Sequence, residues 1–505
     1  MTSFFTHGNL PLRGRTYFSP RPQGTNSVTT LVGVTPYIYD PYRCSNWSMW
    51  TLNLAYVTAF TTHTIAQYFF GYNTLRFSGS MVAERPNNDI LADYFGLSQT
   101  FESTVLIEPR LQNVVAQFQG YFGLDGLAKG LYFNIYAPLT WVRSELKLKE
   151  TVNATGILTP YPANYMSNVA IPAPLMSVEE AFKRTVPFGD VQEPLRFGTI
   201  AGPKTLVRIA DVHMIFGWNF LLQDNGHVGL NIHAVAPTGN RSRAVYLFEP
   251  IAGNGHHWEL GLGASGHVRI WEKDGDQDLC LYVDATITHL FSSLQRRSFD
   301  LCKNGFGSRY ILIKQFDGSG AYIRSSLPAI NRTTLFCNVS RPVQVDFTIM
   351  FGYKHCDVSF DFGYNGWIVS REKLCLREGI QPNTYGFKGI QNVTLMSGAA
   401  SQATESTARL HGTNFAFQAL LTDNPSPVFI STADINVHSG AAHMAFTHKL
   451  FAHLNYAWQD ICWNAEPFFG GGGDVEFVGE KPRNDTPNKP FMGQWSIWIK
   501  AGLVY

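Results

Sequence analysis

The chain has 505 residues, a net charge of +1 and only 15% charged residues, while 14% of its residues are aromatic and 45 are glycine. A net charge this close to zero does not indicate a nucleic-acid-binding protein. The charged fraction is low compared with the ~25% of ordinary soluble domains. The sequence contains no apolar run of about 18 residues, which argues against transmembrane helices.

The first segment, residues 1–45, is rich in Pro, Gly and Arg and shows no clear alternation of apolar and polar residues. We predict that this segment forms an amino-terminal extension or a plug. Residues 46–505 are predicted to form one β-structured unit, because apolar and polar residues alternate through much of this range.

The alternation predicts about 14 strands, within a range of about 12 to 18. Tight turns such as Gln223-Asp-Asn-Gly226 and Asp274-Gly-Asp276 separate some of them, and Asn-Gly supplies the positive φ that a hairpin needs. The predicted strands are 47–60, 64–80, 103–122, 130–148, 204–223, 226–238, 256–272, 278–290, 342–354, 356–372, 409–421, 427–438, 441–458 and 491–505.

Long polar segments alternate with the short turns, and we predict that they are loops. These segments are 150–203, 291–341, 373–408 and 459–490. Short helices are expected at 87–95 and at 177–184, where Ser177 and Glu180 form a capping box. The run Gly470–Gly473 is expected to be a flexible loop tip, since it lacks the Lys and Ser/Thr of a phosphate-binding loop.

The two faces of the predicted strands differ in chemistry. In the strand that ends at Trp271, Leu260 and Leu262 share one phase, whereas Glu259 and His267 share the other. A soluble sandwich buries its apolar face, while a membrane barrel turns it toward lipid. Long strands favour the barrel, as does the gathering of aromatic residues near strand ends, at Trp141, Trp218, Trp258 and Trp458.

The final strand, Gln494 to Tyr505, places Trp495, Ile497, Ile499, Ala501 and Leu503 on one phase and ends on an aromatic residue. This strand resembles the closing strand of bacterial outer-membrane β-barrels. The resemblance implies an all-β, transmembrane antiparallel barrel in the bacterial outer membrane, surrounded by outer-membrane lipid. It also implies that the barrel-assembly machinery reads the strand ending at Tyr505.

The start of the chain, Met1-Thr-Ser-Phe-Phe-Thr-His-Gly, has no basic region followed by an apolar core, so it is not a secretory signal. An outer-membrane protein needs such a signal. We therefore expect that this sequence is a mature form or that its start is misplaced. A soluble β protein would explain the missing signal more simply.

The resemblance implies a porin-like channel for passive passage of small solutes. Two alternatives stay open: a plugged outer-membrane transporter for hydrophobic substrates, and a soluble structural β protein such as a capsid or surface-layer subunit. We predict no enzyme and no cofactor, because catalytic motifs are lacking. Ser431 and His448 could form a lipase-like pair, but no sequence motif surrounds either residue. Nucleic acid is not an expected partner, and a homo-oligomer remains open.

If the polar phase faces a lumen, its ionisable residues set the selectivity of the channel. Histidines gather on this phase, but no short-range motif frames a metal site, so we interpret them as polar lumen residues. The candidate pore-lining residues are Asp211, His213, Glu259, His267, Arg269, Asp284, Asp346, Asp357, Asp361, Arg371, Lys449, His453 and Lys500.

The seven cysteines are an odd number, so they cannot all pair within one chain. Hairpin disulfides between Cys356 and Cys375, or between Cys280 and Cys302, are one interpretation. Free cysteines are the other, and we expect this one.

Overall fold

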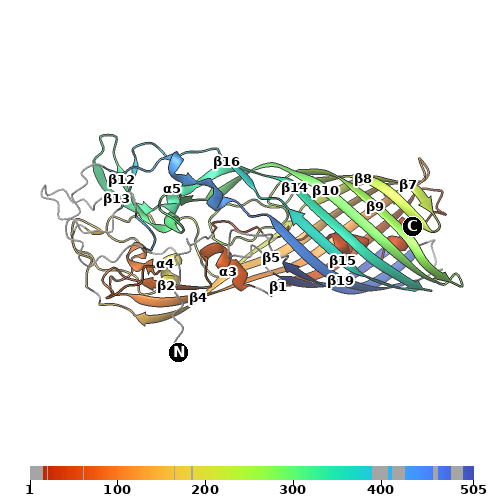
Figure 1. Ribbon diagram of the computed structural model, residues 1–505, viewed down its shortest axis with the longest axis horizontal. Helices are drawn as coiled ribbons and strands as arrows, with labels where there is room; N and C mark the ends of the chain where they lie inside the picture. The colour runs from red at the N-terminus through yellow and green to blue at the C-terminus, as the bar shows by residue number, and fades with distance from the viewer. Residues whose placement is uncertain are drawn as a thin grey trace, which may run out of the picture.

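The computed structural model describes residues 15–19, 21–60, 62–157, 159–163, 165–183, 186–388, 408–411, 427–458, 465–478 and 493–505. Within these ranges, twelve antiparallel strands form a closed barrel (Figure 1). In order around the barrel they are β1 (Trp47–Ala59), β4 (Glu102–Gly123), β5 (Leu131–Ala154), β7 (Val212–Gln223), β8 (Gly226–Ala236), β9 (Glu259–Lys273), β10 (Gln277–Ser298), β14 (Thr334–His355), β15 (Val358–Val369), β19 (Ala445–Ala457), β20 (Glu466–Val478) and β21 (Gln494–Val504).

The barrel closes between β1 and β21, whose register runs from Met49 opposite Val504 to Ala59 opposite Gln494. Backbone hydrogen bonds between Ser48 and Tyr505 extend this pairing to the end of the chain. The predicted terminal strand is therefore the closing strand. The predicted transmembrane antiparallel barrel is confirmed, and its strand number lies at the lower end of the predicted range.

The outer face of the barrel is apolar and the inner face is polar. Leu262 and Ile497 are 63% and 56% exposed, whereas Asn53 and Asn365 on the inner face are 2% and 0% exposed. A soluble β protein has the opposite distribution, since it buries its apolar face. The exterior is that of a barrel surrounded by lipid. None of the helices in the described ranges has the length and hydropathy to span a bilayer.

One end of the barrel carries a unit built from long loops, which we call the loop unit and which lies opposite the C-terminal end of the chain in Figure 1. Its buried apolar core includes Phe69, Phe101, Tyr161, Ile313 and Leu327. Its helices and turns are α3 (His63–Phe70), η1 (Ala92–Phe95), α4 (Val178–Phe182), η2 (Ser308–Tyr310), α5 (Ile330–Thr333), η3 (Thr432–Asp434) and η4 (Val437–Gly440).

Short strands complete the loop unit. Four of them extend the barrel sheet: β2 (Thr74–Ser78), β3 (Ile90–Leu91), β6 (Lys204–Ile209) and β16 (Lys373–Leu376). Two small separate sheets contain β11 (Asp300–Leu301) with β18 (Ile435–Asn436), and β12 (Leu312–Phe316) with β13 (Tyr322–Pro328) and β17 (Tyr385–Phe387).

Several strand predictions were wrong in the loop unit. The predicted strand 64–80 is helix α3 followed by β2, because Ile65 and Phe69 bury at helical spacing and Gly71 ends the helix with a φ of 79°. The predicted strand 427–438 is reduced to the two-residue strand β18, which lies between the helical turns η3 and η4.

Other strand boundaries also differ. The predicted strand 204–223 is divided into β6 and β7 at Ala210 and Asp211, and the predicted loop 291–341 includes the ends of β10 and β14. The predicted strand 409–421 lies outside the described residues, except for 409–411. Helix 177–184 is confirmed as α4, with the Glu180 amide donating to Ser177, whereas 87–95 is helical only in η1.

The glycine run Gly470–Gly473 is not a loop tip but lies within barrel strand β20. A Cβ atom on Gly470 would lie 2.6 Å from Nε2 of His453, and one on Gly472 would lie 2.9 Å from Cζ2 of Trp498. Glycine is required because large side chains from β19 and β21 cross this strand inside the barrel. The predicted loop 459–490 therefore contains a membrane-spanning strand.

All six cysteines in the described ranges are free, so neither proposed disulfide forms.

Candidate functional site: the lumen and the segment that fills it

The amino-terminal segment runs through the inside of the barrel from the loop unit toward the opposite mouth. At the loop unit, the Thr16 amide donates to the carbonyl oxygen of Ser439, 3.0 Å away. Near the opposite mouth, Tyr39 stacks on His227 with ring centroids 3.6 Å apart. We call residues 21–44 the luminal segment; it contains α1 (Ser27–Leu31) and α2 (Thr35–Ile38). The division at residue 45 stays a prediction, because residues 1–14 lie outside the described ranges.

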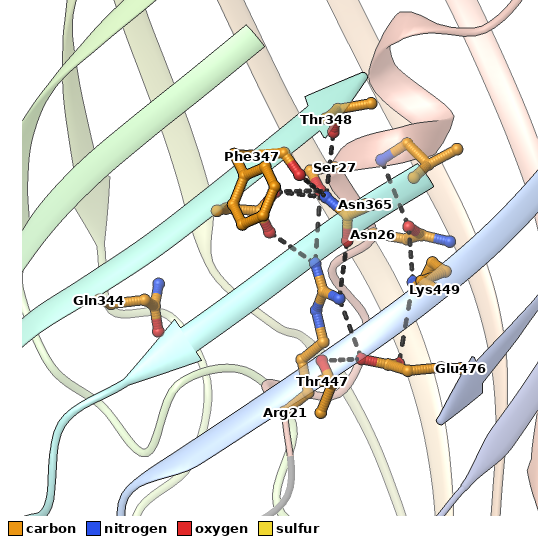
Figure 2. Close-up of polar contacts among 12 residues, drawn as sticks. Arg21, Asn26, Ser27, Gln344, Phe347, Thr348, Asn365, Thr447, Lys449 and Glu476 are labelled. Atoms are coloured by element: carbon orange, nitrogen blue, oxygen red, sulfur yellow. Dashed lines mark hydrogen bonds and ion pairs between the residues drawn. The ribbon is translucent and has the colours of Figure 1, made fainter. Parts of the chain in front are cut away.

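Arg21 fixes the start of the luminal segment to three barrel strands (Figure 2). Its guanidinium lies 2.5 Å from Asp346 of β14 and 3.0 Å from Glu476 of β20, and it also donates to Asn365 of β15 at 3.0 Å. The Arg21 side chain is only 7% exposed. A buried guanidinium is tolerated only when it is paired and hydrogen-bonded, as it is here.

The start of α1 is held by a second set of contacts. Asn26 caps the helix by accepting from the Val28 amide, and its Oδ1 also accepts from Nζ of Lys449, 3.0 Å away. The side-chain Nδ2 of Asn26 donates to the Asp474 carboxylate at 2.8 Å, and Lys449 pairs with the same carboxylate at 3.4 Å. Asn26 therefore joins the start of α1 to β19 and β20.

The end of α1 is held by Lys500 of the closing strand. Its Nζ donates to the carbonyl oxygens of Thr29 and Val32, each 2.8 Å away. The next turn places the Gly33 amide 2.6 Å from the Asp361 carboxylate of β15, with a φ of 72° that favours glycine. The luminal segment is thus bonded at successive heights to most of one side of the barrel.

A cavity with many polar lining residues lies beside Arg21, and we call it the chamber. Its wall includes four carboxylates, from Asp211, Glu259, Asp284 and Asp346. Four aromatic or imidazole rings also line it: those of His213, His233, Tyr136 and Trp367. Asp211 accepts from the Asn254 amide at 2.6 Å, and Glu259 accepts from the Asn254 side chain at 2.7 Å.

Two pairs of histidines lie on the inner wall. Nδ1 of His213 is 3.1 Å from Nε2 of His233, and the His213 ring stacks on Tyr136 at 4.4 Å. His227 and His267 contact each other closer to the opposite mouth. In the ranges that the structure describes, no group of three or more His, Cys, Asp or Glu side chains is arranged to hold a metal ion.

The structure divides the predicted pore-lining residues into three groups, and whether they line a conducting path stays a prediction. Asp346, Asp361, Lys449 and Lys500 bind the luminal segment, and His453 lies against Gly33. Asp211, His213, Glu259, Asp284 and Asp346 line the chamber.

The third group neither lines the chamber nor holds α1, and one of its members, His267, contacts the luminal segment. Arg269 pairs with Glu272 at 2.6 Å near a turn, and Arg371 is exposed beyond the end of β15. His267 and Asp357 are half-buried, with His267 stacked on Tyr39.

Sequence analysis missed Arg21, Asn365, Asp474 and Glu476. Arg21 lies before the first alternating segment of the sequence. Asp474 and Glu476 lie in β20, which was predicted to be a loop because of its run of glycines. Ser431 and His448 do not form a lipase-like pair in the contacts observed. Ser431 donates to Asp434 at 2.8 Å, and His448 pairs with Tyr364 at 2.7 Å.

A buried ionic cluster joins the barrel to the loop unit. Glu372 follows β15 and contacts Arg297 at 3.2 Å and Arg341 at 3.1 Å, and it accepts from the Ala442 amide at 2.8 Å. Burial alone would raise the pKa of Glu372, but the two guanidinium charges outweigh this effect and hold its pKa at about 2.

Two lysines are buried within the loop unit itself. Lys388 is 0% exposed and Lys314 is 1% exposed. Burial lowers the pKa of Lys388 to about 7 and that of Lys314 to about 8, although Asp190 acts in the opposite direction on both. Nζ of Lys388 lies 4.3 Å from the ring centroid of Tyr165.

No family model and no curated protein matches the chain. Solved structures show a distant likeness over most of its length. An outer-membrane channel from Pseudomonas putida F1 is 10% identical, covers 92% of this chain and 99% of its own, and gives a TM-score of 0.37. A FadL homologue from Pseudomonas aeruginosa is 8% identical over 91% and 90% of the two chains, with a TM-score of 0.25.

A mutant of the monoaromatic hydrocarbon channel TodX is 9% identical over 91% of this chain and 90% of its own, with a TM-score of 0.30. The observed geometry, rather than these low scores, establishes a lipid-exposed barrel whose lumen is occupied by the chain's own amino-terminal segment.

Proposed function

We propose that this protein is a plugged transporter of the bacterial outer membrane that carries hydrophobic small molecules. The observation that carries the proposal is the double anchoring of the luminal segment. Arg21 fixes its start to Asp346 and Glu476, and Lys500 fixes the end of α1. A segment held in this way blocks simple diffusion through the barrel.

The energetics favour a plug over an open pore. Breaking a buried ion pair by removing one partner costs about 3–5 kcal/mol. The state in which such an ion pair is spontaneously broken therefore has a population of roughly 10⁻² to 10⁻⁴, since each 1.4 kcal/mol changes an equilibrium constant by a factor of about ten. Passage therefore requires a change that loosens the luminal segment.

A pocket in the loop unit supports a hydrophobic cargo. It lies among η1, the segment that follows α4, and η2, and most of its lining residues are apolar. Glu193 is the one charged residue of its described lining. The apolar lining includes Tyr94, Phe95, Leu175, Phe188, Leu195 and Tyr310.

The outer-membrane location and its partners belong to the same proposal. The apolar exterior requires lipid, and β21 ends at Tyr505, whose side chain is 53% exposed. The aromatic-terminated strand is the feature that would be presented to the barrel-assembly machinery. The edge of β21 that is free before closure is covered by β1 in the closed barrel.

A porin-like channel is the second candidate, and the polar chamber favours it. Planar-bilayer conductance of the detergent-purified full chain separates the two candidates. A plugged transporter gives a compact band on an unheated gel and almost no conductance steps. Frequent, well-defined steps from the wild-type protein would establish the porin.

The cargo class has a separate test. The apolar fluorophore N-phenyl-1-naphthylamine should bind the purified protein saturably, with a rise in its fluorescence. Replacement of Leu195 by Asn in the apolar pocket should weaken this binding. Equal binding by the variant would place the hydrophobic ligand elsewhere.

A further inference from the structure

We propose that the chamber beside Arg21 is a binding site for a small organic ammonium ion, and that this ion competes with Arg21 for Asp346. The binding site stands on the chamber alone, whereas the competition rests on the proposed plug. The ammonium ion acts here as an effector of the plug and differs in chemistry from the hydrophobic cargo.

The charges of the chamber wall are strongly unequal. Its carboxylates come from four parts of the barrel: Asp211 precedes β7, Glu259 lies on β9, Asp284 on β10 and Asp346 on β14. Arg21 is the one Lys or Arg in the described lining, and Glu476 already shares its charge. A wall with this many acidic groups and one basic group attracts a cation.

The wall also has hydrogen-bond acceptors without donors. Oδ1 of Asp211 and Oε1 of Gln344 are buried and have no hydrogen-bond partner in the structure, and Asp211 is only 1% exposed. The structure shows no hydrogen bond or ion pair for the carboxylate of Asp284 among the described residues. A buried acceptor left unpaired destabilises the folded protein, so a ligand that donates a hydrogen bond here is favoured.

These features select the chemistry of the ligand. A primary ammonium ion carries a positive charge and three N–H donors, which match a wall of carboxylates and unpaired acceptors. Tyr136 and Trp367 add aromatic surface to the same wall. The negative face of an aromatic ring attracts an ammonium group.

Competition with Arg21 follows from the position of Asp346. Asp346 lies opposite Thr286 in the pairing of β10 with β14, two residues from Asp284 on β10. Such diagonal neighbours are about 7–8 Å apart, so a cation between the two carboxylates acts on both. Because Oδ2 of Asp346 is the oxygen that binds Arg21, a bound cation weakens this anchor.

The test uses the purified full chain, with ethylammonium chloride as the probe and tetramethylammonium chloride as the control at matched ionic strength. Tetramethylammonium has the same charge but no N–H donor. Calorimetric titration should show saturable ethylammonium binding that is about tenfold weaker in D284N and D211N, as expected for loss of one charged hydrogen bond. D357N, at the opposite mouth, should bind like the wild type.

Equal affinity for the two ammonium salts, or unchanged binding in both D284N and D211N, would overturn the site. A compact unheated gel band in each variant confirms that the barrel is folded. Ethylammonium should also raise the frequency of conductance steps in the wild type. Binding without this rise overturns the competition step, whereas steps in the absence of the probe overturn the plugged-transporter proposal and leave the binding result intact.

Discussion

Arg21 and Glu476 are 455 residues apart in the sequence and form an ion pair of 3.0 Å inside the barrel. Their side chains are 7% and 2% exposed. Glu476 also lies 3.9 Å from Lys449 and accepts from Thr447, so it stays partnered when Arg21 moves. Glu476 therefore keeps partners on β19 that do not depend on the luminal segment.

Replacement of Arg21 by Ala should open the channel without unfolding the barrel. Removing one partner of a buried pair costs about 3–5 kcal/mol, and this loss falls on the seating of the luminal segment. Single-channel recording should show conductance steps at least about tenfold more frequent than in the wild type. Lys273→Ala, at the exposed end of β9, is the control and should not change the recording.

Replacement of Glu372 by Gln should destabilise the junction between the barrel and the loop unit. The variant leaves Arg297 and Arg341 without their shared carboxylate, at a cost of about 3–5 kcal/mol of unfolding free energy in urea titrations. Glu272→Gln removes an exposed partner of Arg269 and should cost less than about 1 kcal/mol.

The effect of Glu372 also has a defined pH dependence. Its folded-state pKa of about 2 lies below the ordinary glutamate value of 4.5, so its stabilisation is present above about pH 4.5 and is lost as the pH falls toward 2. The difference between wild type and Glu372→Gln should be constant from pH 5 to pH 7. A difference that disappears within that range would contradict this explanation.

The glycines of β20 give a prediction with a neighbouring control. Gly472→Ala should impair assembly, because the new Cβ would lie 2.4 Å from the carbonyl oxygen of Ala452 and 2.9 Å from Trp498. Gly471→Ala places its Cβ no closer than 3.4 Å to any atom outside the adjacent residues and should assemble normally. The yield of compact, heat-modifiable protein measures both.

Buried Lys388 should make the loop unit more stable as the pH rises. Its folded-state pKa of about 7 lies below the ordinary lysine value of 10.5, so between these values the unfolded chain binds a proton that the folded chain does not. The free energy of unfolding therefore increases with pH from about 7 upward.

Thermal unfolding followed by near-ultraviolet circular dichroism at pH 7 and pH 9 tests this expectation. Lys388→Met should show a smaller rise in unfolding temperature between the two pH values than the wild type. Lys273→Met, with an exposed side chain, should keep the full rise. An identical rise in all three proteins would show that Lys388 does not titrate in this range.

Local pattern was sufficient to predict the barrel wall. In β21 the predicted lipid phase is exposed at Ile497 and Ile499, while Trp498 and Lys500 are buried. Period-two alternation reports which side of a strand faces lipid, and it needs no knowledge of distant residues.

Long-range packing explains what the sequence could not predict. β20 was missed because its glycines make room for His453 and Trp498, which lie on other strands. Arg21 was missed because its partners lie on β14, β15 and β20. Neither the identity of such partners nor their closeness is visible in a local pattern.

Lys500 connects the sealing of the lumen to the closure of the barrel. It reaches the backbone of the luminal segment from β21, the strand whose pairing with β1 completes the wall. Lys500 lies opposite Asn53 of β1 and opposite Gly470 of β20, so the residue that holds the end of α1 sits at the seam of the closed sheet. A chain that ended before β21 would lose the last strand of the wall and this hold on α1 together.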